Sequence, residues 1–565
     1  MTKTIASSLP FAAAVLAVLF CWWPPEVYVE FRDLSTSLLF LFAFVAAVVI
    51  RPPSDSGPRM RTLIAVFFFS LAVSAASGVD AYRSAETILR YASLAVFAAA
   101  LAAVADGRAA DRIETVLIGL TFCLCVYGLH QYLYSLPNLV RQPQLWGGLS
   151  KDEILPALTR MAGGRIFSRF ALPSSFSCVL LAVLPIVHRR ILDRKNYRFY
   201  ALVMLLITAN LVLARSYAAV LLFCAYGWVD AWIRYPRRRR TFLVPSAALA
   251  VLALVFLRPE SILNFSDPAN PVRLRATNWS VAWSEFLSAP AFGVGPGNFA
   301  LLFPAYTSGL TETRYAHGFH MTILAETGAA GAILWLALAG VFLYRLFRAA
   351  PSGAHRPHAA SLALMFMYSL VDIVFELPSL SFLFFLLLGL AARSPSSAGP
   401  AQRVSPAPAL VLSSAGLAFS LVVYCAHGYY EQGMDILRGS RISVASLQSA
   451  DDLFMKSLRL WPHPETHAAR GRADWERYRL SPEKGGPHLA SAISHFSAAV
   501  RKSPASANGR SALAESLFAA GNITASMVHF KEAARLDPRG PHLKRYTQLL
   551  LGQHLQAPDD DRPSF

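Results

Sequence analysis

The chain has 565 residues, of which 55% are hydrophobic and 15% are charged, and its formal net charge is +18. Apolar runs long enough to cross hydrocarbon, roughly 17–25 residues each, recur from the N-terminus to about residue 426, which excludes a string of soluble domains. The positive charge gives no support to nucleic-acid binding, because the basic residues gather in alternate loops between the apolar runs.

The apolar runs predict an all-α fold, a polytopic helical membrane protein with thirteen spans. Trp22, Trp23 and Pro24 follow the first run, where a signal peptide would have a small-residue cleavage site, so we expect this segment to be a retained helix. The predicted spans lie at residues 5–23, 34–50, 62–77, 86–105, 114–135, 171–188, 199–214, 217–235, 241–257, 328–347, 359–377, 380–393 and 407–426.

Basic residues predict the orientation of these spans. Cytoplasmic loops carry an excess of lysine and arginine, so the N-terminus is predicted to be cytoplasmic. The odd number of spans then puts the tail after residue 427 outside, together with the loops 24–33, 78–85, 136–170 and 258–327. The basic clusters include Arg59 and Arg61, Arg108 and Arg112, Arg189 and Arg190, Arg237 to Arg240, and Arg345 and Arg348.

The six cysteines all lie in or beside apolar segments, without paired spacing in a polar region. They therefore predict buried membrane thiols, and neither a zinc site nor a disulfide framework. They are Cys21, Cys123, Cys125, Cys178, Cys224 and Cys425.

Two of the predicted outer loops are long, and long loops are usually functional or disordered. The first, 136–170, contains ILPALTRM, which predicts a short amphipathic helix. The second, 258–327, contains NWSVAWSEFL, which predicts an amphipathic helix with tryptophan at the lipid boundary. Three glycines within PAFGVGPGNF can expose backbone N–H groups to an anion, although a plain chain reversal explains them equally well.

The tail predicts a second domain, residues 427–565, built from helical repeats. Phe454, Phe496 and Phe530 each precede a proline by eight residues. The separation of 34 residues between Phe496 and Phe530 is the period of the tetratricopeptide repeat (TPR), and 42 residues separate Phe454 from Phe496. Such a domain binds partners rather than performing chemistry. The alternative is an unrelated helical tail with chance spacing.

The ordered motifs of residues 1–426 resemble the O-antigen ligase and O-antigen polymerase superfamily of bacterial surface-polysaccharide enzymes. GLHQY at 128–132, GRIFSRF at 164–170 and SLVDIVFELP at 369–378 are similar to family motifs, and a TPR tail occurs on many members. In the large loop the resemblance rests on Trp279, Pro290, Gly293 to Phe299, Pro304 to Tyr306, Ala316 and His317, and Glu326, Gly328 and Gly331.

The chain departs from the family pattern at two positions. Gly318 stands where the family usually has Asn after its histidine, and Tyr217 stands where it often has Arg, with Arg215 displaced by two residues. The second polar group that the family has beside its histidine is therefore absent at position 318, and the arginine of the middle span lies at position 215.

The resemblance implies a membrane glycosyltransferase that moves a glycan from an undecaprenyl pyrophosphate carrier to an acceptor hydroxyl on the outer face of the bacterial cytoplasmic membrane. Because lipid pyrophosphate is already a good leaving group, one base and a set of cations suffice, and neither a metal nor a cofactor is expected. His317 is the implied base. The implied substrate-binding residues are Arg275, Arg273, Arg215, Arg165, Gly295 and Gly297, with His320 and Asp372 as auxiliary groups.

Without the resemblance, His317 reads as a helix cap and the arginines as anchors at the membrane boundary. A metal site at His317 and His320 lacks an evident third ligand. Asp372, inside a predicted span, is expected to pair with a membrane arginine if its role is structural.

Several functions remain open at the level of sequence. A ligase, an exopolysaccharide or O-antigen polymerase and a protein O-oligosaccharyltransferase share the donor and differ in the acceptor, which is a glycan, a lipid or a protein. A transporter is disfavoured by the scarcity of ionisable residues within the spans. A non-catalytic envelope scaffold acting through a protein partner of the TPR tail is the remaining alternative.

Overall fold

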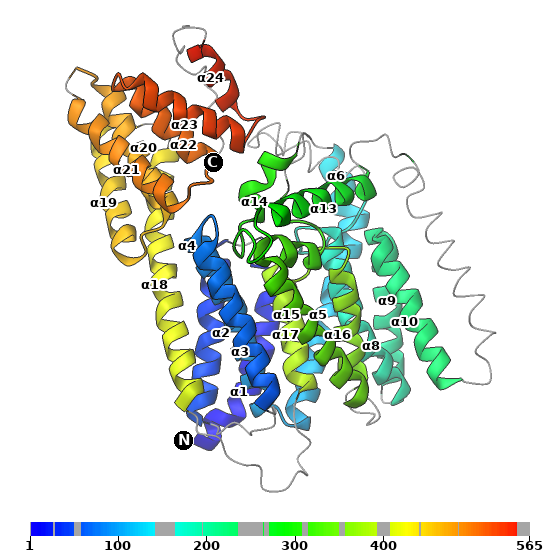
Figure 1. Ribbon diagram of the computed structural model, residues 1–565. Helices are drawn as coiled ribbons and strands as arrows, with labels where there is room; N and C mark the ends of the chain where they lie inside the picture. The colour runs from blue at the N-terminus through cyan, green and yellow to red at the C-terminus, as the bar shows by residue number, and fades with distance from the viewer. Residues whose placement is uncertain are drawn as a thin grey trace.

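The computed structural model describes residues 2–25, 27, 29–49, 58–141, 164–194, 196–235, 264, 270–307, 313, 315–349, 356–392, 407–439, 442–483 and 485–550. Within these ranges the protein is helical throughout and contains no strand, which confirms the predicted fold class. The helices form a bundle with a smaller helical domain at one end (Figure 1).

The bundle contains the helices of residues 2–438 that run along its long axis (Figure 1). Their bounds are α1 (Thr2–Trp22), α2 (Val29–Val49), α3 (Pro58–Ser77), α4 (Ala81–Val104), α5 (Gly107–His130), α8 (Pro173–Leu192), α9 (Tyr197–Ala214), α10 (Tyr217–Arg234), α15 (Phe319–Ala349), α16 (Arg356–Ser369), α17 (Pro378–Ala391) and α18 (Ala407–Arg438). The predicted spans overlap these helices, but the span 359–377 extends beyond the end of α16, the span 114–135 runs from α5 into a short π-helix, and the span 241–257 lies outside the described residues.

By length and composition, six described helices are able to cross a membrane, namely α4, α5, α8, α9, α15 and α18. Shorter apolar segments of α1, α2, α3 and α17 lie beside them. The total of thirteen spans therefore stays a prediction.

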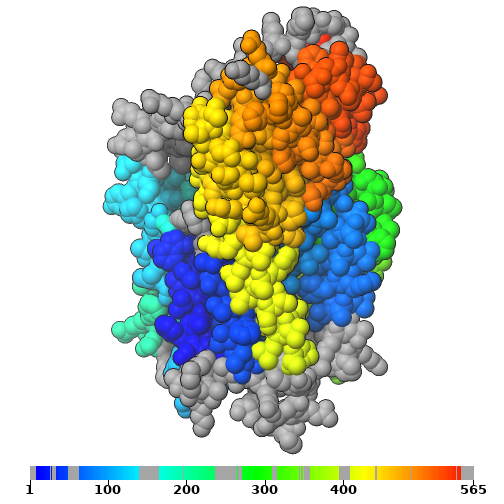
Figure 2. Space-filling view, turned by 90° about the vertical axis from the view of Figure 1, so that its left-hand side faces the viewer, coloured from blue at the N-terminus to red at the C-terminus, as the bar shows by residue number. Residues whose placement is uncertain are grey.

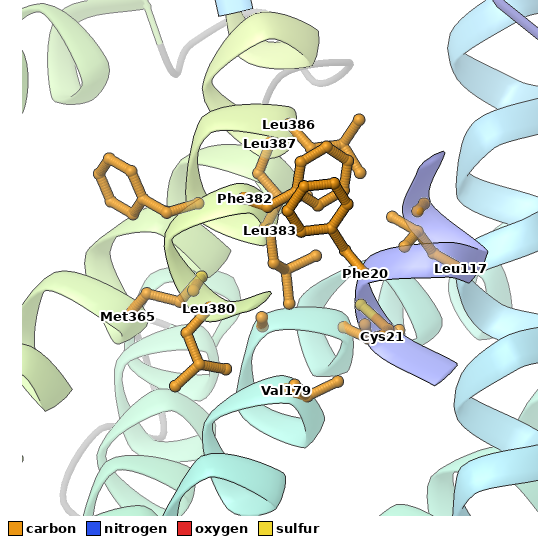
Figure 3. Close-up of a cluster of buried hydrophobic side chains, with 14 of the residues drawn as sticks. Phe20, Cys21, Leu117, Val179, Met365, Leu380, Phe382, Leu383, Leu386 and Leu387 are labelled. Carbon is orange, nitrogen blue, oxygen red and sulfur yellow. The ribbon is translucent and has the colours of Figure 1, made fainter. Parts of the chain in front are cut away.

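The core of the bundle lies around α8 and α17. Both helices are apolar on nearly every side, as expected for helices surrounded by others. Phe20 of α1 stacks on Phe382 of α17 with ring centroids 4.1 Å apart, and Phe97 of α4 lies 5.3 Å from the same ring. Figure 3 shows Phe20 and Cys21 facing Phe382 and Leu383 across this core.

Shorter helices lie at one end of the bundle, opposite to the end that holds the N-terminus (Figure 1). Pro271 begins α13, and the Asn270 side chain accepts hydrogen bonds from the N–H groups of Val272 and Arg273, a capping arrangement that starts the helix. The short elements are the π-helix η1 (Gln131–Ser135), α6 (Leu136–Arg141), α13 (Pro271–Ser288), α14 (Phe299–Leu302) and the 3-10 helix η4 (Phe303–Tyr306). The predicted helix ILPALTRM lies outside the described residues.

The C-terminal helical domain, defined here as α19 to α24, stands at the same end. Phe454, Phe496 and Phe530 lie on α19, α21 and α23 and are buried. Gly433 and Gly471 face the first two of these rings, so close that an added Cβ would overlap them. The helices are α19 (Val444–Leu460), α20 (Pro464–Leu480), α21 (Gly486–Lys502), α22 (Ala507–Ala519), α23 (Ile523–Leu536) and α24 (Pro541–Leu550). Packed helix pairs agree with a repeat, while the TPR assignment stays a prediction.

Helix α18 joins the bundle to this domain without interruption. Its first half packs on α2, where Ser37 donates a hydrogen bond to Ser420 at 3.0 Å, and its last turns pack on α19. Figure 2 shows α18, in yellow, running along the bundle and continuing into the orange helices. The predicted domain boundary at residues 426 and 427 thus falls inside a continuous helix.

Candidate functional site

A break in α15 shapes the end of the bundle where the large loop lies. Gly328 has φ 64° and ψ −166°, outside the helical region, so neighbouring backbone groups lack their usual helical partners. Residues 289–298, called here the glycine-rich turn, supply them. The hydrogen bonds run from Val294 N–H to Ala325 O (3.1 Å), Gly295 N–H to Glu326 O (2.9 Å), Ala329 N–H to Pro290 O (2.9 Å) and Ala330 N–H to Ala291 O (3.2 Å).

Glycine is required where the turn and the break meet. Gly293 and Gly328 have positive φ, and a Cβ at either residue would overlap the backbone of the other segment. Gly295 and Gly297 also have positive φ and pack against α4. Because the Gly295 N–H is donated to Glu326, these glycines position the turn in this structure, and their predicted role in substrate binding stays a prediction.

His317 lies two residues before the start of α15. Its φ of 54° is in the left-handed region, which is uncommon outside glycine. The ring Nδ1 lies 3.6 Å from Oδ1 of Asp372. The His317 side chain is 29% exposed and the Asp372 side chain 4%, so a histidine within reach of solvent faces a buried carboxylate.

Asp372 does not lie in a helix, which corrects the prediction that it sits inside the span 359–377. Helix α16 ends at Ser369 and α17 begins at Pro378. Proline restricts the residue before it to extended conformations, so the helix cannot run through Leu377 into α17. The residues between the two helices are not helical, so the N–H of Ile373 is not part of a helix. It donates a hydrogen bond to Asp372 Oδ1 at 2.8 Å.

Arg275 of α13 binds the same carboxylate. Its Nη2 donates to Asp372 Oδ2 at 3.1 Å, and its Nε donates to the Val371 carbonyl at 2.7 Å. Nη1 donates to the Pro271 carbonyl at 3.3 Å. The expected pairing of Asp372 with an arginine is therefore present, and it brings Arg275, His317 and Asp372 together from three separate parts of the chain.

Trp279, one turn after Arg275, contacts the backbone of His317 and the ring of His320. Its Nε1 donates to the His317 carbonyl at 3.4 Å, and its ring meets that of His320 edge to face, with centroids 5.5 Å apart. A Cβ added to Gly318 would itself lie 2.9 Å from Trp279 Nε1. The indole therefore occupies the space that the larger residue expected at position 318 would need.

A second buried carboxylate near His317 went unnoticed at the sequence level. Glu376 accepts a hydrogen bond from Thr322 at 2.9 Å, and its carbonyl accepts one from Arg90 Nη1 at 3.2 Å. Tyr91 donates to the carbonyl of Phe375 at 3.0 Å. The available signal was Arg90, a charged residue inside a predicted span, because such residues mark polar sites in the membrane.

Arg165 and Arg215 come together on a neighbouring turn. Arg215 follows α9 in the left-handed conformation, and Arg165 Nε donates to the adjacent Ala214 carbonyl at 3.1 Å. Tyr368 connects this turn to Asp372, since its hydroxyl lies 2.9 Å from Ser216 Oγ and its carbonyl accepts the Asp372 N–H at 3.1 Å. Arg273 is an exposed residue of α13, two positions before Arg275 and so on a different face of the helix.

The motifs GLHQY and GRIFSRF meet each other. Gln131 begins the π-helix η1, and its Oε1 accepts hydrogen bonds from the N–H groups of Phe167 and Ser168, both at 2.9 Å. Ser168 has a φ of 53° and donates through Oγ to the Leu124 carbonyl at 2.9 Å. These residues fix the segment that follows Arg165.

Glu285 of α13 is a fully buried carboxyl whose oxygens have no hydrogen-bond partner within the described part of the protein. Burial raises the pKa of Glu285 well above its usual value, and the nearby Glu326 raises it further. The described residues also contain no group of three or more His, Cys, Asp and Glu side chains suited to a metal ion.

The fold and this polar cluster define a multi-pass helical membrane protein with a candidate site at one end of its bundle. Residues 202–336 match a family model described as O-antigen ligase, a stretch that includes Arg215, Arg275, the glycine-rich turn and His317. The match supports a membrane enzyme of the O-antigen ligase type. No curated protein and no solved structure was found to match the chain.

Proposed function

We propose that the protein is a glycosyltransferase that moves a glycan from an undecaprenyl pyrophosphate carrier to an acceptor hydroxyl at the outer face of a bacterial cytoplasmic membrane. The observation that carries the proposal is the partly exposed His317 beside the buried Asp372, which Arg275 also binds. The family matched by residues 202–336 implies a lipid-linked glycan donor and a glycan acceptor, which agrees with this chemistry.

In the proposed reaction the acceptor oxygen attacks the sugar carbon that bears the pyrophosphate. The new C–O bond forms as the bond to the pyrophosphate oxygen breaks, and the lipid pyrophosphate leaves with the bonding electrons. His317 takes the acceptor proton. Because Nδ1 faces Asp372, Nε2 is the nitrogen that would accept this proton, and the carboxylate would stabilise the imidazolium.

The arginines would hold the donor's charge. A guanidinium has five N–H donors, and the hydrogen bonds of Arg275 to Asp372, Val371 and Pro271 use three of them. The remaining donors of Arg275 suit the oxygens of a phosphate. Arg165 and Arg215 would bind the second phosphate, and Arg273 would meet the donor at the exposed face of α13.

The proposed orientation follows from the distribution of basic residues, which puts the N-terminus in the cytoplasm. The large loop and the C-terminal helical domain lie at the other end of the bundle (Figure 1), and so would face the outside. There the helical domain would bind a protein or polysaccharide partner, as repeat domains do.

Glycan transfer by the purified protein in detergent tests the proposal. The donor is an undecaprenyl pyrophosphate oligosaccharide, and wild type is compared with His317→Ala and Arg275→Ala. His488→Ala and Arg234→Ala serve as controls, because these residues lie in α21 and at the far end of α10. We expect wild type and controls to release lipid pyrophosphate, and both site variants to lose most of this activity.

Product size then separates ligation from polymerisation. Transfer by His317→Ala at the rate of wild type would show that His317 is not the base. A wild type that is inert with several donors would remove the glycosyltransferase proposal and leave the scaffold as the alternative.

A further inference from the structure

The C-terminal helical domain contacts the outer end of α4 through a cluster centred on Tyr82. The Tyr82 ring lies 5.0 Å from the Trp461 ring, and Lys502 Nζ donates to the Tyr82 hydroxyl at 2.5 Å. Trp461 Nε1 donates to Glu86 at 3.0 Å. Arg83 forms an ion pair with Glu465 at 3.2 Å. Trp461 caps the end of α19, Glu465 lies in α20 and Lys502 ends α21, so the first part of the domain contacts α4.

A second, apolar contact lies directly on the glycine-rich turn. Val294 of the turn and Leu302 of α14 are buried in one cluster with Ala505 and Leu536 of the C-terminal helical domain. Leu536 is 2% exposed, although it is the last residue of α23. The domain therefore covers the side chain of Val294, while the backbone of Val294 is bonded to Ala325 of α15.

The turn links this contact to the candidate site. Its backbone supplies the hydrogen-bond partners that α15 lacks around Gly328, and the Phe299 N–H donates to the buried Glu326 carboxylate at 3.2 Å. Ser74 of α3 donates to the Glu326 carbonyl at 2.8 Å, and Val79 N–H donates to the Val294 carbonyl at 3.0 Å. His317 immediately precedes the first turns of the same helix, α15.

We propose that the C-terminal helical domain positions the candidate site, by holding the glycine-rich turn in the break of α15 and thereby fixing the helix start that carries His317. Leu536 and Tyr82 are then positioning residues for the reaction proposed above, and the activity part of the proposal rests on that function. The domain acts here as a part of the active fold, in addition to any partner that it binds.

The physical reason lies in the glycines of the turn, whose ordering needs contacts in addition to the hydrogen bonds to α15. Glycines sample many backbone conformations, so the ordering of three of them in five residues is costly in entropy. Apolar side chains buried against the domain offset this cost. A shift of about 1 Å in a catalytic group can lower a rate on the order of 10²-fold, so a loosened turn would affect chemistry more than binding.

Hydrogen exchange of the full-length protein in detergent tests the positioning role independently of activity. The variants are Leu536→Asp and Tyr82→Ala, with Val528→Asp as the matched control, because Val528 lies on α23 and is 61% exposed. We expect the amides of residues 293–295 and 329–330 to exchange at least about tenfold faster in Leu536→Asp. Exchange in α8 should be unchanged, which would show that the bundle remains folded. In the conservative variant Leu536→Met, the amides of residues 293–295 and 329–330 should exchange at the rate of wild type.

Transfer kinetics complete the test. We expect Leu536→Asp to lower kcat about tenfold or more, with a smaller change in KM for the donor. Leu536→Met should keep a kcat close to that of wild type. Unchanged protection of the turn in both Leu536→Asp and Tyr82→Ala would overturn the proposal, as would faster exchange with an unchanged kcat. If wild type shows no transfer, the proposed function fails, while the exchange result still decides whether the domain holds the turn.

Discussion

Two clusters in this protein contain the same three kinds of side chain, a carboxylate, a histidine and an arginine. In the candidate site Asp372 binds Arg275 at 3.1 Å and faces His317 at 3.6 Å. In the second cluster Glu114 of α5 binds Arg190 of α8 at 2.8 Å and faces His358 at 3.1 Å. The two clusters lie at opposite ends of α16, which begins near His358 and ends shortly before Asp372.

Access to solvent distinguishes them. His358 is 0% exposed and Arg190 17%, whereas His317 is 29% and Arg275 30% exposed. Both carboxylates are almost completely buried. His317 is therefore within reach of solvent, while the Glu114 cluster is buried where it joins α5, α8 and α16. The same three residue types therefore occur in an open and in a closed setting, and the exposure of the histidine is what separates the candidate site from the buried cluster.

The largest expected effect is on activity, at the open cluster. We expect His317→Ala to lower the transfer rate by about 10²–10⁴-fold, the usual contribution of a general base. Its thermal unfolding in detergent should stay close to that of wild type, because the side chain is partly exposed and Arg275 still pairs with Asp372. A large loss of stability with retained activity would reverse the roles assigned to the two clusters.

The second effect is on stability, at the closed cluster. His358→Ala should lower the free energy of unfolding by about 1–3 kcal/mol, because the buried Glu114 loses one hydrogen-bond partner while its ion pair with Arg190 remains. The transfer rate per folded molecule should stay near that of wild type. Thermal unfolding in detergent, with activity normalised to the folded fraction, checks both parts. A variant as stable as wild type would show that the cluster contributes nothing to the bundle.

Arginine-to-lysine changes test whether the arginines of the two clusters have different roles. Lysine keeps the charge and loses the planar fork, so Arg275→Lys should weaken donor binding and lower kcat/KM by about tenfold, on the order of one lost charge-assisted hydrogen bond. Arg190→Lys should leave the transfer kinetics of the folded protein unchanged. Equal kinetic effects of the two changes would indicate that the arginines act through the fold alone.

The smallest expected effect is on the pH dependence of stability and concerns a histidine of the C-terminal helical domain. His467 of α20 stacks on His495, with ring centroids 6.2 Å apart. Burial, aided by the neighbouring charges of His495 and Lys502, lowers the pKa of His467 to about 4. The unfolded chain therefore binds more protons between pH 6.5 and 4, and the stability contributed by neutral His467 is lost as pH falls through this window.

Thermal unfolding at pH 7 and pH 5 measures this loss. We expect His467→Asn to weaken the pH dependence of unfolding in the C-terminal helical domain relative to wild type. An identical pH dependence in wild type and His467→Asn would show that His467 does not contribute.

Some contacts of the candidate site were expected from the sequence and others were not. Arg275, His317 and Asp372 meet, and Asp372 has the arginine partner that was expected. Glu376, Thr322 and Arg90 were missed, because their contacts join segments far apart in the chain. The end of α16 before Asp372 was also missed, since the segment up to Leu377 is apolar enough to resemble part of a span.

The sequence by itself determined the helices of this protein, because an apolar run in hydrocarbon must satisfy its backbone hydrogen bonds within the segment. Only the tertiary structure decided that the glycine-rich turn fills the break at Gly328, and that α18 carries the bundle into the C-terminal helical domain. It also decided which cluster is open, because exposure depends on the packing of helices that local sequence does not specify.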